Sequence, residues 1–424
     1  MTGMQNGERS EQLRHFSEKL AAYSRSGIPL KIPETWSEAF DQLRIHLESY
    51  KGKHKQVVFF DEIPWLSTHR SGFLEALDYF WNDWASTANI VVVICGSAAS
   101  WMLENIVQNK GGLHNRITQL IRLKPFTLKE TKTYLSAQGV QLDLYQICLI
   151  YMAMGGIPHY LQGIKPGESA YQNINRLCFE KDGLLRHEFQ NLYKALFDYA
   201  DNHIEIIKAL SKKWKGLTRN EIIKTTKFTN GGGLTKILTE LEESSFISVN
   251  APFGKKKKDS LYRLSDEYSM FYLHYIEKST STEKDAWLAV TKSASYLAWS
   301  GYAFESLCIK HTLEIKKALG ISGVFTEISS FYKPGNKEKQ GYQIDVLIER
   351  DDRCINLCEM KFYNSEYTIT KDYAQKIRRK KTGFAETTKT KKHIFITLVT
   401  TYGLLKNEQS LGLIDQVITL KDLF

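Results

Sequence analysis

The chain has 424 residues, of which 42% are hydrophobic, 12% aromatic and 25% charged. This composition is typical of a globular protein; it excludes a collagenous, low-complexity or mostly disordered chain, and the length favours two to three domains. The 57 basic and 47 acidic residues give a formal charge of +10, which permits binding to a polyanion such as DNA but does not require it.

The apolar segments are too short for a membrane protein. Val91–Cys95 and Leu144–Met154 are among the longest of them, and both fall well short of the ~20 residues that span a bilayer. The N-terminus is polar and contains no signal-peptide core. The six cysteines include no CxxC pair, so neither a zinc site nor a disulfide framework is expected. The sequence predicts a cytoplasmic protein without a membrane partner.

The first part of the chain alternates strand-like and helix-like segments. Helices are expected at Glu11–Tyr23, Trp36–Tyr50 and Gly72–Trp84, and strands at Gln56–Phe60, Ile90–Cys95 and Leu120–Leu123. Strands that are apolar on both faces and alternate with helices are typical of a parallel sheet that is buried on both sides. We therefore expect an α/β domain in this part of the chain.

A helical stretch follows, from Thr127 to about Tyr199. It begins with a capping box, in which Thr127 is the N-cap and Glu130 is the third residue after it. From Asn202 to Arg263 the pattern changes to helix, short helix, turn, helix and an extended pair, with four consecutive lysines between the two extended segments. This order is typical of a winged helix; a generic helical linker followed by a hairpin is the alternative.

From Ala298 onward, a helix precedes a series of strand-like segments. Strands are expected at Val324–Ile328, Gln343–Ile348, Cys354–Lys361 and His393–Leu398, and a second helix at Tyr373–Lys381. These changes of pattern divide the chain into four expected regions, residues 1–126, 127–200, 201–285 and 286–424.

Acidic and hydroxyl side chains follow two of the first strands. Val57–Phe60 runs directly into Asp61 and Glu62. Ile90–Cys95 is followed by a glycine and then by Ser97. In a parallel sheet such residues meet at the carboxyl edge, where ligands bind; an Asp there can orient magnesium, and a Glu after it can polarise an attacking water. The pattern is weak by itself, because strands often end in acidic turns.

Two later motifs strengthen this pattern: GGLHNR, which ends at Arg116, and GGIPHYL, which begins at Gly155. With FFDEIPWL and ICGSAASWM they stand in the order and rough spacing of the AAA+/STAND-type ATPases of the archaeal-ATPase group, which residues 1–200 resemble. By this resemblance Asp61 and Glu62 are the Walker B pair, with Asp61 on magnesium and Glu62 catalytic. Ser97 stands at the sensor position, and Arg116 matches an arginine that acts on the γ-phosphate of ATP.

The phosphate-binding loop of that family, GxxxxGK[ST], is absent. The 56 residues before Val57 are polar and helical, whereas the family places a strand, the loop, a helix and a second strand before its helical pair. We therefore expect that the chain begins beyond these elements, that its parallel sheet is incomplete, and that upstream DNA encodes the rest. Without the backbone amides and the lysine that hold the β- and γ-phosphates, the chain is not expected to hydrolyse ATP efficiently.

The C-terminal region holds a second group of candidate residues. Asp345 ends a short extended segment, and Glu359 and Lys361 form an E-x-K pair on the next strand. Because side chains alternate along a strand, Glu359 and Lys361 point to the same side, and with Asp345 they are expected to place two carboxylates and an ammonium group on one face. The carboxylates can hold magnesium, and the lysine can orient or activate water at a phosphodiester.

This arrangement, with Glu305 on a preceding helix, resembles the PD-(D/E)xK nuclease fold, specifically the nuclease-like domain at the C-terminus of the same ATPase group. The resemblance implies that Asp345 and Glu359 are metal ligands. Lys361 would be catalytic, and Glu305 an auxiliary carboxylate. Gln375, on the following helix, is a weaker candidate. The D-x13-E-x-K spacing is much more specific than E-x-K alone, which occurs often on solvated edge strands.

The basic run at the tip of the expected hairpin is a candidate for contacts with DNA phosphates. It consists of Lys255, Lys256, Lys257 and Lys258. For a single basic run, an ordinary solvated loop is the competing interpretation.

Together these patterns predict an α/β protein with an incomplete P-loop NTPase-like parallel sheet, a helical lid, a winged-helix module and a restriction-endonuclease-like α/β domain. The leading hypothesis is an ATPase-family protein coupled to a DNA-directed, metal-dependent nuclease, with ATP and Mg²⁺ as the cofactors of the family. The alternatives are a non-enzymatic DNA-binding or scaffold protein with inactive sites, and a magnesium nuclease that needs no nucleotide. Homo-oligomer formation is left open.

Overall fold

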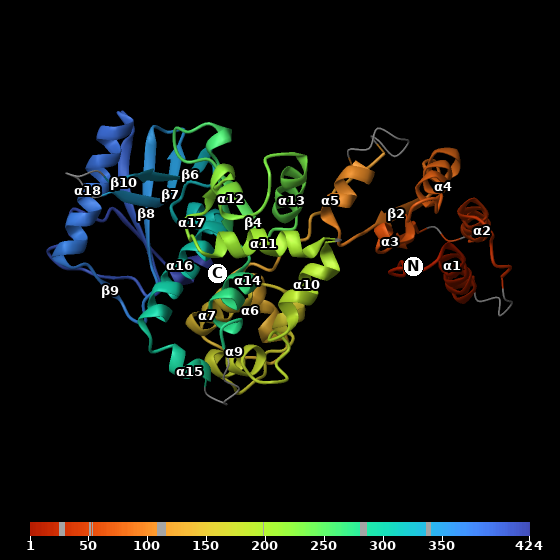
Figure 1. The fold of residues 1–424 in the computed structure, drawn as a ribbon, viewed down its shortest axis with the longest axis horizontal. Helices are drawn as coiled ribbons and strands as arrows, with labels where there is room; N and C mark the ends of the chain where they lie inside the picture. Colours follow the sequence, from red (N-terminus) through yellow and green to blue (C-terminus); the bar gives the residue numbers. More distant parts are fainter. Residues whose placement is uncertain are drawn as a thin grey trace. The chain divides into compact units, whose positions relative to one another are not determined.

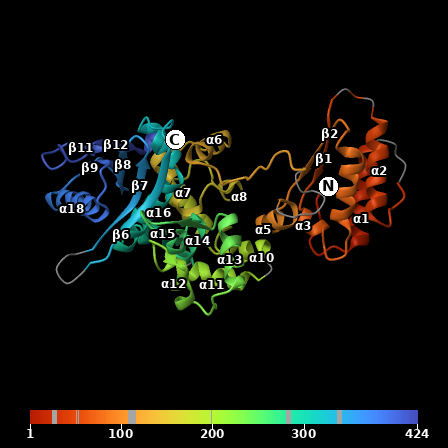
Figure 2. The same ribbon diagram turned by 90° about the horizontal axis from the view of Figure 1, so that it is seen from above.

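The structure, a computed structural model, describes residues 1–24, 30–50, 52, 54–107, 116–197, 199–279, 286–335 and 341–424. The chain divides into two compact units, unit 1 (Met1–Arg122) and unit 2 (Leu123–Phe424). The fold is mixed α/β, with parallel strand pairs in both units (Figure 1, and Figure 2 for the second view). Within the described ranges, no helix is long and apolar enough to cross a bilayer.

Unit 1 contains a two-stranded parallel sheet, β1 (Gln56–Phe60) and β2 (Ile90–Ile94), and a set of helices. The helices are α1 (Arg9–Ser24), α2 (Trp36–Ser49), α3 (Ile63–Leu66), α4 (Phe73–Phe80) and α5 (Ala99–Met102), with π-helical turns at Trp81–Ala85 and Leu103–Val107. The three helices and the first two strands predicted for this part of the chain are present.

The sheet of unit 1 is covered on one face. Val58 and Phe60 point into the core, where the rings of Phe60 and Phe40 lie 5.7 Å apart between centroids. On the other face Val57 is 65% and Phe59 46% exposed. The expectation of a sheet buried on both sides is therefore not met by the described residues, because they cover one side alone.

The third strand expected in this region is absent. Leu120–Leu123 has no strand pairing, and its leucines are exposed, Leu123 at 92%. A strand needs a neighbouring segment that satisfies its backbone hydrogen bonds, and the described residues contain no strand paired with Leu120–Leu123. The boundary between the two units falls inside it, between Arg122 and Leu123.

Unit 2 begins with α6 (Leu128–Ala137), α7 (Leu144–Met154), α8 (Pro158–Leu161), α9 (Ala170–Cys178) and α10 (Glu188–Leu196). The predicted capping box is present: the Thr127 amide donates to the Glu130 carboxylate at 2.8 Å, and the Thr127 hydroxyl accepts from the Glu130 amide at 3.3 Å. The GG turn lies between α7 and α8, and a Cβ on Gly156 would lie 2.0 Å from the Phe126 carbonyl oxygen. Glycine is therefore required there for the close approach of the two backbones.

The next segment runs helix, strand, helix, helix, strand, strand. Its elements are α11 (Ala200–Ser211), β3 (Leu217–Thr218), α12 (Arg219–Thr225), α13 (Gly232–Glu243), β4 (Ile247–Asn250) and β5 (Leu261–Leu264), with a 3-10 turn at Lys257–Asp259. The strands form an antiparallel sheet in the order β3-β5-β4. This is the predicted order with the short β3 in addition, and the lysine run lies in the loop of the β4–β5 hairpin.

A five-stranded mixed sheet forms the C-terminal part of unit 2, in the order β12-β10-β8-β7-β6. The helices of this part are α14 (Glu267–Phe271), α15 (Ala286–Val290), α16 (Ala294–Lys310), α17 (Thr312–Ala318) and α18 (Lys371–Thr388), with a π-helical turn at Tyr272–Ile276. The strands are β6 (Thr326–Lys333), β7 (Tyr342–Arg350), β8 (Cys354–Lys361), β10 (His393–Thr400) and β12 (Gln416–Thr419), a separate pair β9 (Tyr367–Thr368) and β11 (Leu404–Leu405), and a final 3-10 turn at Leu420–Leu423. The pairs β6–β7 and β7–β8 are antiparallel, and β8–β10 and β10–β12 are parallel.

Helices cover both faces of this sheet (Figure 1). On one face Phe384 of α18 shares a core cluster with Ile344 and Leu357. On the other face Phe304 of α16 shares a cluster with Val346. Glu359 and Lys361 thus lie on the middle strand, β8, and Asp345 on its neighbour β7, in a sheet that is enclosed between helices.

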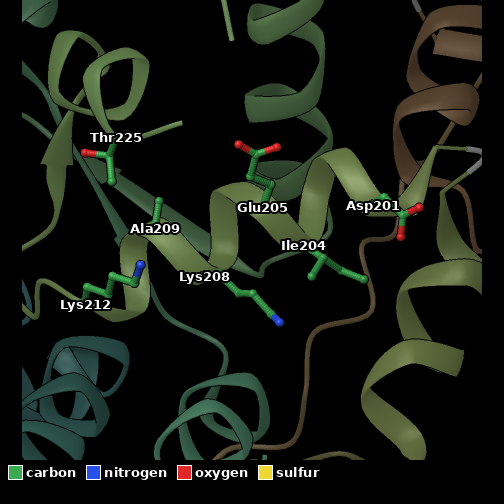
Figure 3. Close-up of a pocket in the computed structure, with 7 residues that line it drawn as sticks. All are labelled: Asp201, Ile204, Glu205, Lys208, Ala209, Lys212 and Thr225. Carbon is green, nitrogen blue, oxygen red and sulfur yellow. The ribbon is translucent and has the colours of Figure 1, made fainter. Parts of the chain in front are cut away.

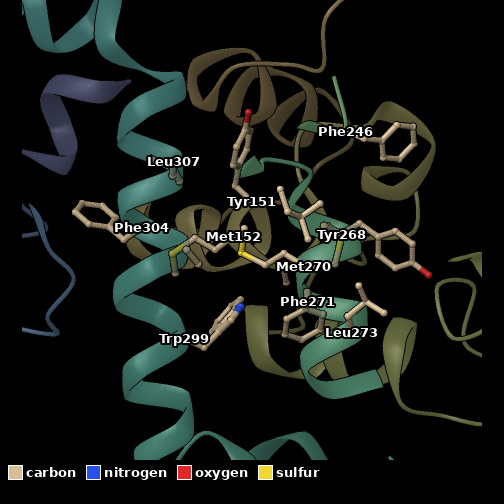
Figure 4. Close-up of a cluster of buried hydrophobic side chains, with 14 of the residues drawn as sticks. Tyr151, Met152, Phe246, Tyr268, Met270, Phe271, Leu273, Trp299, Phe304 and Leu307 are labelled. Carbon is tan, nitrogen blue, oxygen red and sulfur yellow. The ribbon is translucent and has the colours of Figure 1, made fainter. Parts of the chain in front are cut away.

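The core on the α16 side runs through most of unit 2. Figure 4 shows part of it, with Tyr151 of α7, Phe246 before β4, and Phe271 and Trp299 from α14 and α16. These residues come from three of the four regions expected from the sequence, residues 127–200, 201–285 and 286–424. The three regions therefore share one hydrophobic core cluster.

Candidate functional site

The first predicted group lies at the carboxyl edge of β1 and β2. Asp61 and Glu62 follow β1, and Ser97 follows β2. The Glu62 backbone has a left-handed conformation, with φ 52°, and its Oε2 accepts hydrogen bonds from the Ser97 amide at 3.2 Å and the Ser97 hydroxyl at 3.0 Å. The structure brings these three residues together because parallel strands end at the same edge of a sheet.

Two other side chains hold the Asp61 carboxylate. It accepts hydrogen bonds from the Cys95 thiol and the Thr2 hydroxyl, each at 3.2 Å. The Gly3 amide also donates to the Asp61 carbonyl at 2.8 Å. Burial, together with the hydrogen bond to Asp61, raises the pKa of the Cys95 thiol to about 11. Cys95 therefore remains a protonated donor at neutral pH.

The described part of unit 1 shows no ion pair between a basic side chain and this acidic group, in particular its carboxylates Asp61 and Glu62. Arg116 is exposed, and no hydrogen bond or ion pair connects it to the group in the ranges that the structure covers; residues 111–115 of its motif lie outside them. The group offers carboxylates and a hydroxyl, whereas phosphates require cations or backbone amides.

The second predicted group surrounds β7 and β8. Glu359 is 6% exposed; its Oε2 accepts a hydrogen bond from the Tyr373 hydroxyl at 2.7 Å, and its Oε1 pairs with the Lys380 ammonium group. The Lys361 ammonium nitrogen lies 4.4 Å from the centroid of the Tyr373 ring. Glu359 and Lys361 thus both face α18, as their spacing along β8 predicts.

Asp345 lies in a β-bulge of β7. The pairing of β6 with β7 shifts by one residue at Ser330, so that Asp345 and Val346 together oppose it. A bulge changes the direction of a side chain relative to the regular alternation. The Asp345 carboxylate accordingly contacts the Gln343 amide and Glu305 of α16. This differs from the predicted placement of both carboxylates on one face, since Glu359 contacts α18.

Glu305 and Asp345 form a buried carboxyl pair. Burial raises the pKa of Glu305; the negative charge of Asp345 raises it further, and Arg263 opposes the shift. The Arg263 Nη2 lies 2.8 Å from the Glu305 Oε1. Burial and the neighbouring carboxylate thus both favour the protonated form of Glu305.

Lys361 has a lowered pKa. Burial is the main cause, and the positive charges of Lys380 and Lys376 add to it, while Glu359 and Asp345 oppose it. The Asp345 carboxylate thus acts on the Lys361 ammonium group, although the direct contacts of Asp345 are with Gln343 and Glu305. A lysine with a lowered pKa can exchange a proton with water at lower pH than an exposed one.

The carboxylates around β7 and β8 fit a magnesium ion in part. In the described part of the chain, no three His, Cys, Asp or Glu side chains are arranged to hold a metal. Mg²⁺ is usually bound by one or two carboxylates, with water and substrate phosphate in the other positions. The paired carboxyls of Glu305 and Asp345 offer such a donor set, whereas both oxygens of Glu359 already contact Tyr373 and Lys380.

The sequence patterns did not identify Tyr373 and Lys380 as site residues. The weaker candidate Gln375 is exposed, and these two residues of α18 contact Glu359 instead. They occupy the same helix face as the buried Ile377 and Phe384. A lysine on the apolar stripe of an amphipathic helix is the pattern that could have identified the site from sequence, because such a lysine needs a buried carboxylate as its partner.

The β4–β5 hairpin is attached to the same sheet. The Phe253 amide donates to the Ser330 carbonyl at 2.7 Å, and the Phe253 ring packs edge-on against Phe384 at 5.1 Å between centroids. Arg263 of β5 pairs with Glu305. The predicted DNA-binding hairpin and the acidic group are therefore joined by direct contacts at the β7 bulge.

A cavity of about 420 Å³ beside α11 contains none of the predicted site residues. It is lined by Asp201, Ile204, Glu205, Lys208, Ala209, Lys212 and Thr225. In Figure 3 the side chains of Glu205 and Lys208 point away from each other, and Lys208 pairs with Glu277 at 2.7 Å. The cavity does not gather charged groups around one position.

No model of a known protein family matches the chain. It is 24% identical over 376 residues to an uncharacterized protein of Methanocaldococcus jannaschii, a match that covers 88% of this chain and 80% of that protein. Among solved structures it is similar to a Walker-type ATPase of Pyrococcus abyssi, with a TM-score of 0.44, 17% identity, and coverage of 64% of this chain and 79% of the other.

Proposed function

We propose that this chain is a DNA-directed, metal-dependent nuclease with a phosphodiester-cleaving site on β7 and β8, joined to an ATPase-like unit that does not hydrolyse ATP. The observation that carries the proposal is the grouping of a partly buried lysine with carboxylates on adjacent strands: Lys361 two residues after Glu359, and Asp345 paired with Glu305. Lysine with two or more carboxylates is suited to hydrolysis of a phosphodiester.

Each side chain has a role in this proposal. Asp345 and Glu305 would hold the magnesium ion, which when bound supplies a Lewis acid that polarises the phosphate. Glu359 would add a third carboxylate when a DNA phosphate draws Lys380 away from it. Lys361 would orient the attacking water, and its ammonium group would offset the negative charge that grows on the phosphate oxygens.

Residues 201–264 would act as a winged helix that delivers DNA. The hairpin loop carries exposed lysines at its tip, while its base is attached to the sheet through Phe253 and Arg263. DNA phosphates held by the loop would be kept at a fixed position relative to the acidic group.

Cleavage of supercoiled plasmid by the full chain with Mg²⁺ or Mn²⁺ tests the proposal. Asp345→Asn and Lys361→Ala are expected to abolish cleavage while leaving DNA binding intact. Lys361→Arg is expected to fail as well, because the larger, permanently charged guanidinium does not replace the ammonium group. The matched controls Asp352→Asn and Lys391→Ala, both exposed, should keep full activity. Equal cleavage in all variants would identify a contaminating nuclease and refute the proposal.

The second candidate is a non-enzymatic DNA-binding or scaffold protein. It is favoured by one observation: Glu359 and Glu305 each already pair with a basic side chain, Lys380 and Arg263. DNA binding without cleavage in either metal, by a folded wild-type chain, would establish this function instead.

A further inference from the structure

Arg263 joins the β4–β5 hairpin to the acidic pair on the C-terminal sheet. It lies on β5, five residues after Lys258 at the hairpin tip. Its Nη2 lies 2.8 Å from the Oε1 of Glu305, which in turn contacts Asp345. The side chains of Arg263 and Glu305 are each 12% exposed. A nearly buried cation therefore lies beside the two carboxyl groups to which the proposed function assigns magnesium.

The guanidinium group of Arg263 has unused donors. Its Nε and Nη2 atoms are buried, and within the described residues neither meets an acceptor in hydrogen-bond geometry. Arg176, elsewhere in unit 2, differs: its Nε donates to Glu168 at 2.9 Å and its Nη2 to the Gly163 carbonyl at 3.0 Å. Unsatisfied buried donors cost free energy, so Arg263 would gain from an acceptor that accepts two parallel hydrogen bonds, as a phosphate does.

Arg263 and a metal ion compete for the same carboxylate. Mg²⁺ is bound by one or two carboxylates, with water and substrate phosphate in its other positions. The Glu305 Oε1 already faces the Arg263 cation, and two cations beside one oxygen repel each other. Loss of the guanidinium group without a replacement would leave buried negative charge uncompensated. Exchange of one cation for the other satisfies both conditions.

DNA bound to the hairpin can supply the other anion for Arg263. The five residues from Lys258 to Arg263 span at most about 18 Å, and a DNA strand carries a phosphate about every 3.4 Å along its axis. A strand that contacts the tip can therefore place a phosphate beside Arg263. The exchange requires movement of the side chain alone, since the base of the hairpin is attached to the sheet by the bond from the Phe253 amide to the Ser330 carbonyl.

We propose that Arg263 is a built-in counter-ion that blocks the metal site until DNA binds. A DNA phosphate takes the guanidinium group, and the freed carboxylates of Glu305 and Asp345 then bind magnesium. The inference rests on the proposed function for the identity of the metal ligands and adds the regulation of that site. It also explains why a metal ligand is paired with a basic side chain in the absence of DNA.

Mn²⁺ binding to the full chain without DNA, measured by isothermal titration calorimetry, tests the block. Arg263→Met should bind Mn²⁺ about fivefold to 150-fold more tightly than the wild type, the usual range for coupled sites. Arg263→Gln, which removes the charge but keeps a donor, should show the same gain and serves if the Met variant does not fold. Arg176→Met breaks a partly buried Arg–Glu pair elsewhere in unit 2 and should bind like the wild type.

The gain must come from the acidic pair. The double variant Arg263→Met, Glu305→Gln should therefore lose it. Equal or weaker Mn²⁺ binding in folded Arg263→Met, or a gain that survives Glu305→Gln, would overturn the block and leave Arg263 as a structural link between hairpin and sheet.

The effect of Mn²⁺ on DNA affinity tests whether DNA takes the guanidinium group. Fluorescence anisotropy with a labelled duplex, with and without Mn²⁺, is measured in full chain that carries Lys361→Ala, for which no cleavage is expected. Two ligands that both favour the displaced Arg263 strengthen each other's binding. Mn²⁺ should therefore raise DNA affinity more when Arg263 is present than in Arg263→Met. An equal rise in both, or no DNA binding at all, would overturn the transfer to DNA.

The inference and the proposed function fail separately. A wild type that cuts plasmid while Arg263→Met binds Mn²⁺ no more tightly refutes the inference alone. A gain in Mn²⁺ affinity that depends on Glu305, in a chain that cuts no DNA, refutes the nuclease alone.

Discussion

Lys380 illustrates how one residue reveals a site. It lies on the buried side of α18, in line with Tyr373, Ile377 and Phe384, where a charged side chain is unfavourable unless it is paired. Its partner is Glu359, whose side chain is only 7% exposed. The pair places a cation where a substrate phosphate or a metal would compete for the Glu359 carboxylate.

The competition between Lys380 and metal gives a measurable prediction. Lys380→Gln leaves the buried Glu359 without its counter-ion, and we expect a loss of about 3–5 kcal/mol in unfolding free energy without metal. Addition of Mg²⁺ should restore part of this loss and should stabilise the variant more than the wild type. Urea unfolding with and without Mg²⁺ measures both effects, with Lys391→Gln as the exposed control. An equal response of wild type and variant to Mg²⁺ would contradict the role of Glu359 as a ligand.

A second buried pair lies beneath the GG turn. Glu267 at the start of α14 is 4% exposed and pairs with Lys310 at 2.7 Å. Its Oε2 would lie 3.1 Å from a Cβ on Gly155. Burial raises the pKa of Glu267, and Lys310 opposes the shift. The glycine therefore has a structural explanation in this chain, because a larger residue would press on a buried ion pair.

The pH dependence of stability tests this pair. Because the folded chain raises the pKa of Glu267, protonation favours the folded state; the contribution is fully present below the carboxyl pKa of the unfolded chain and is lost as pH rises through the folded value. In Lys310→Met the shift becomes larger, so we expect a loss of about 3–5 kcal/mol at about pH 8 and a smaller loss at about pH 5. Urea unfolding at the two values measures it. The double variant Glu267→Gln, Lys310→Met should recover most of the stability at the higher pH; a loss independent of pH would show that lost packing of the lysine stem is the cause.

At the scale of elements, the β4–β5 hairpin has two different ends. Its base is tied to the C-terminal sheet by Phe253 and Arg263. Its tip carries Lys255, Lys256 and Lys258 with exposed side chains. The basic tip was predictable because a run of lysines can be read directly from the sequence. The base was not, because it is attached by one phenylalanine and one arginine that contact segments far away in the chain.

Replacing the four lysines at positions 255–258 with alanine should change the salt dependence of DNA binding. Each phosphate contact contributes about 0.9 to the slope of log affinity against log salt for duplex DNA, so the slope should fall by up to about 3 to 4 units. Affinity should fall alike for unrelated sequences, because phosphates carry no sequence information. Binding titrations at several salt concentrations measure the slope. Four-alanine replacement of the exposed lysines at 129, 132, 389 and 391 is the charge-matched control, and an unchanged slope in the hairpin variant would assign the run to ordinary solvated surface.

At the scale of the whole molecule, the chain has separate cores. The core cluster of unit 1 extends from Leu13 to Ile106, and the two clusters of unit 2 contain no residue before Leu128. Within unit 2, by contrast, one cluster runs from Leu128 to Leu423. Segments that share a hydrophobic core tend to unfold together. We therefore expect the molecule to unfold as two units.

Calorimetry or urea unfolding with two core variants tests this expectation. Phe40→Ala removes a ring that contacts Phe60 and Phe80 in unit 1, and Phe271→Ala removes a fully buried ring in unit 2. Each should cost about 3–5 kcal/mol and should shift one of two transitions while leaving the other in place. A single transition that both variants shift equally would mean that the whole chain unfolds together.

The sequence by itself determined the features that depend on neighbouring residues. The helix at Trp36–Ser49, the capping box at Thr127 and the order of elements from α11 to β5 follow from local periodicity and from side chains three or four residues apart. The common direction of Glu359 and Lys361 follows from strand alternation in the same way. These features need no information about the rest of the chain.

The tertiary structure alone decided which distant groups meet. The bulge at Asp345 sends that carboxylate to Glu305, and α18 brings Tyr373 and Lys380 to Glu359. Leu120–Leu123 resembles a strand in sequence but pairs with no strand among the described residues, which also leave one face of the β1–β2 sheet uncovered. Strand pairing and burial depend on segments that are far apart in the chain, and no local sequence pattern shows which of them will meet. Strand alternation and helix capping involve residues only a few positions apart, so the sequence shows them directly.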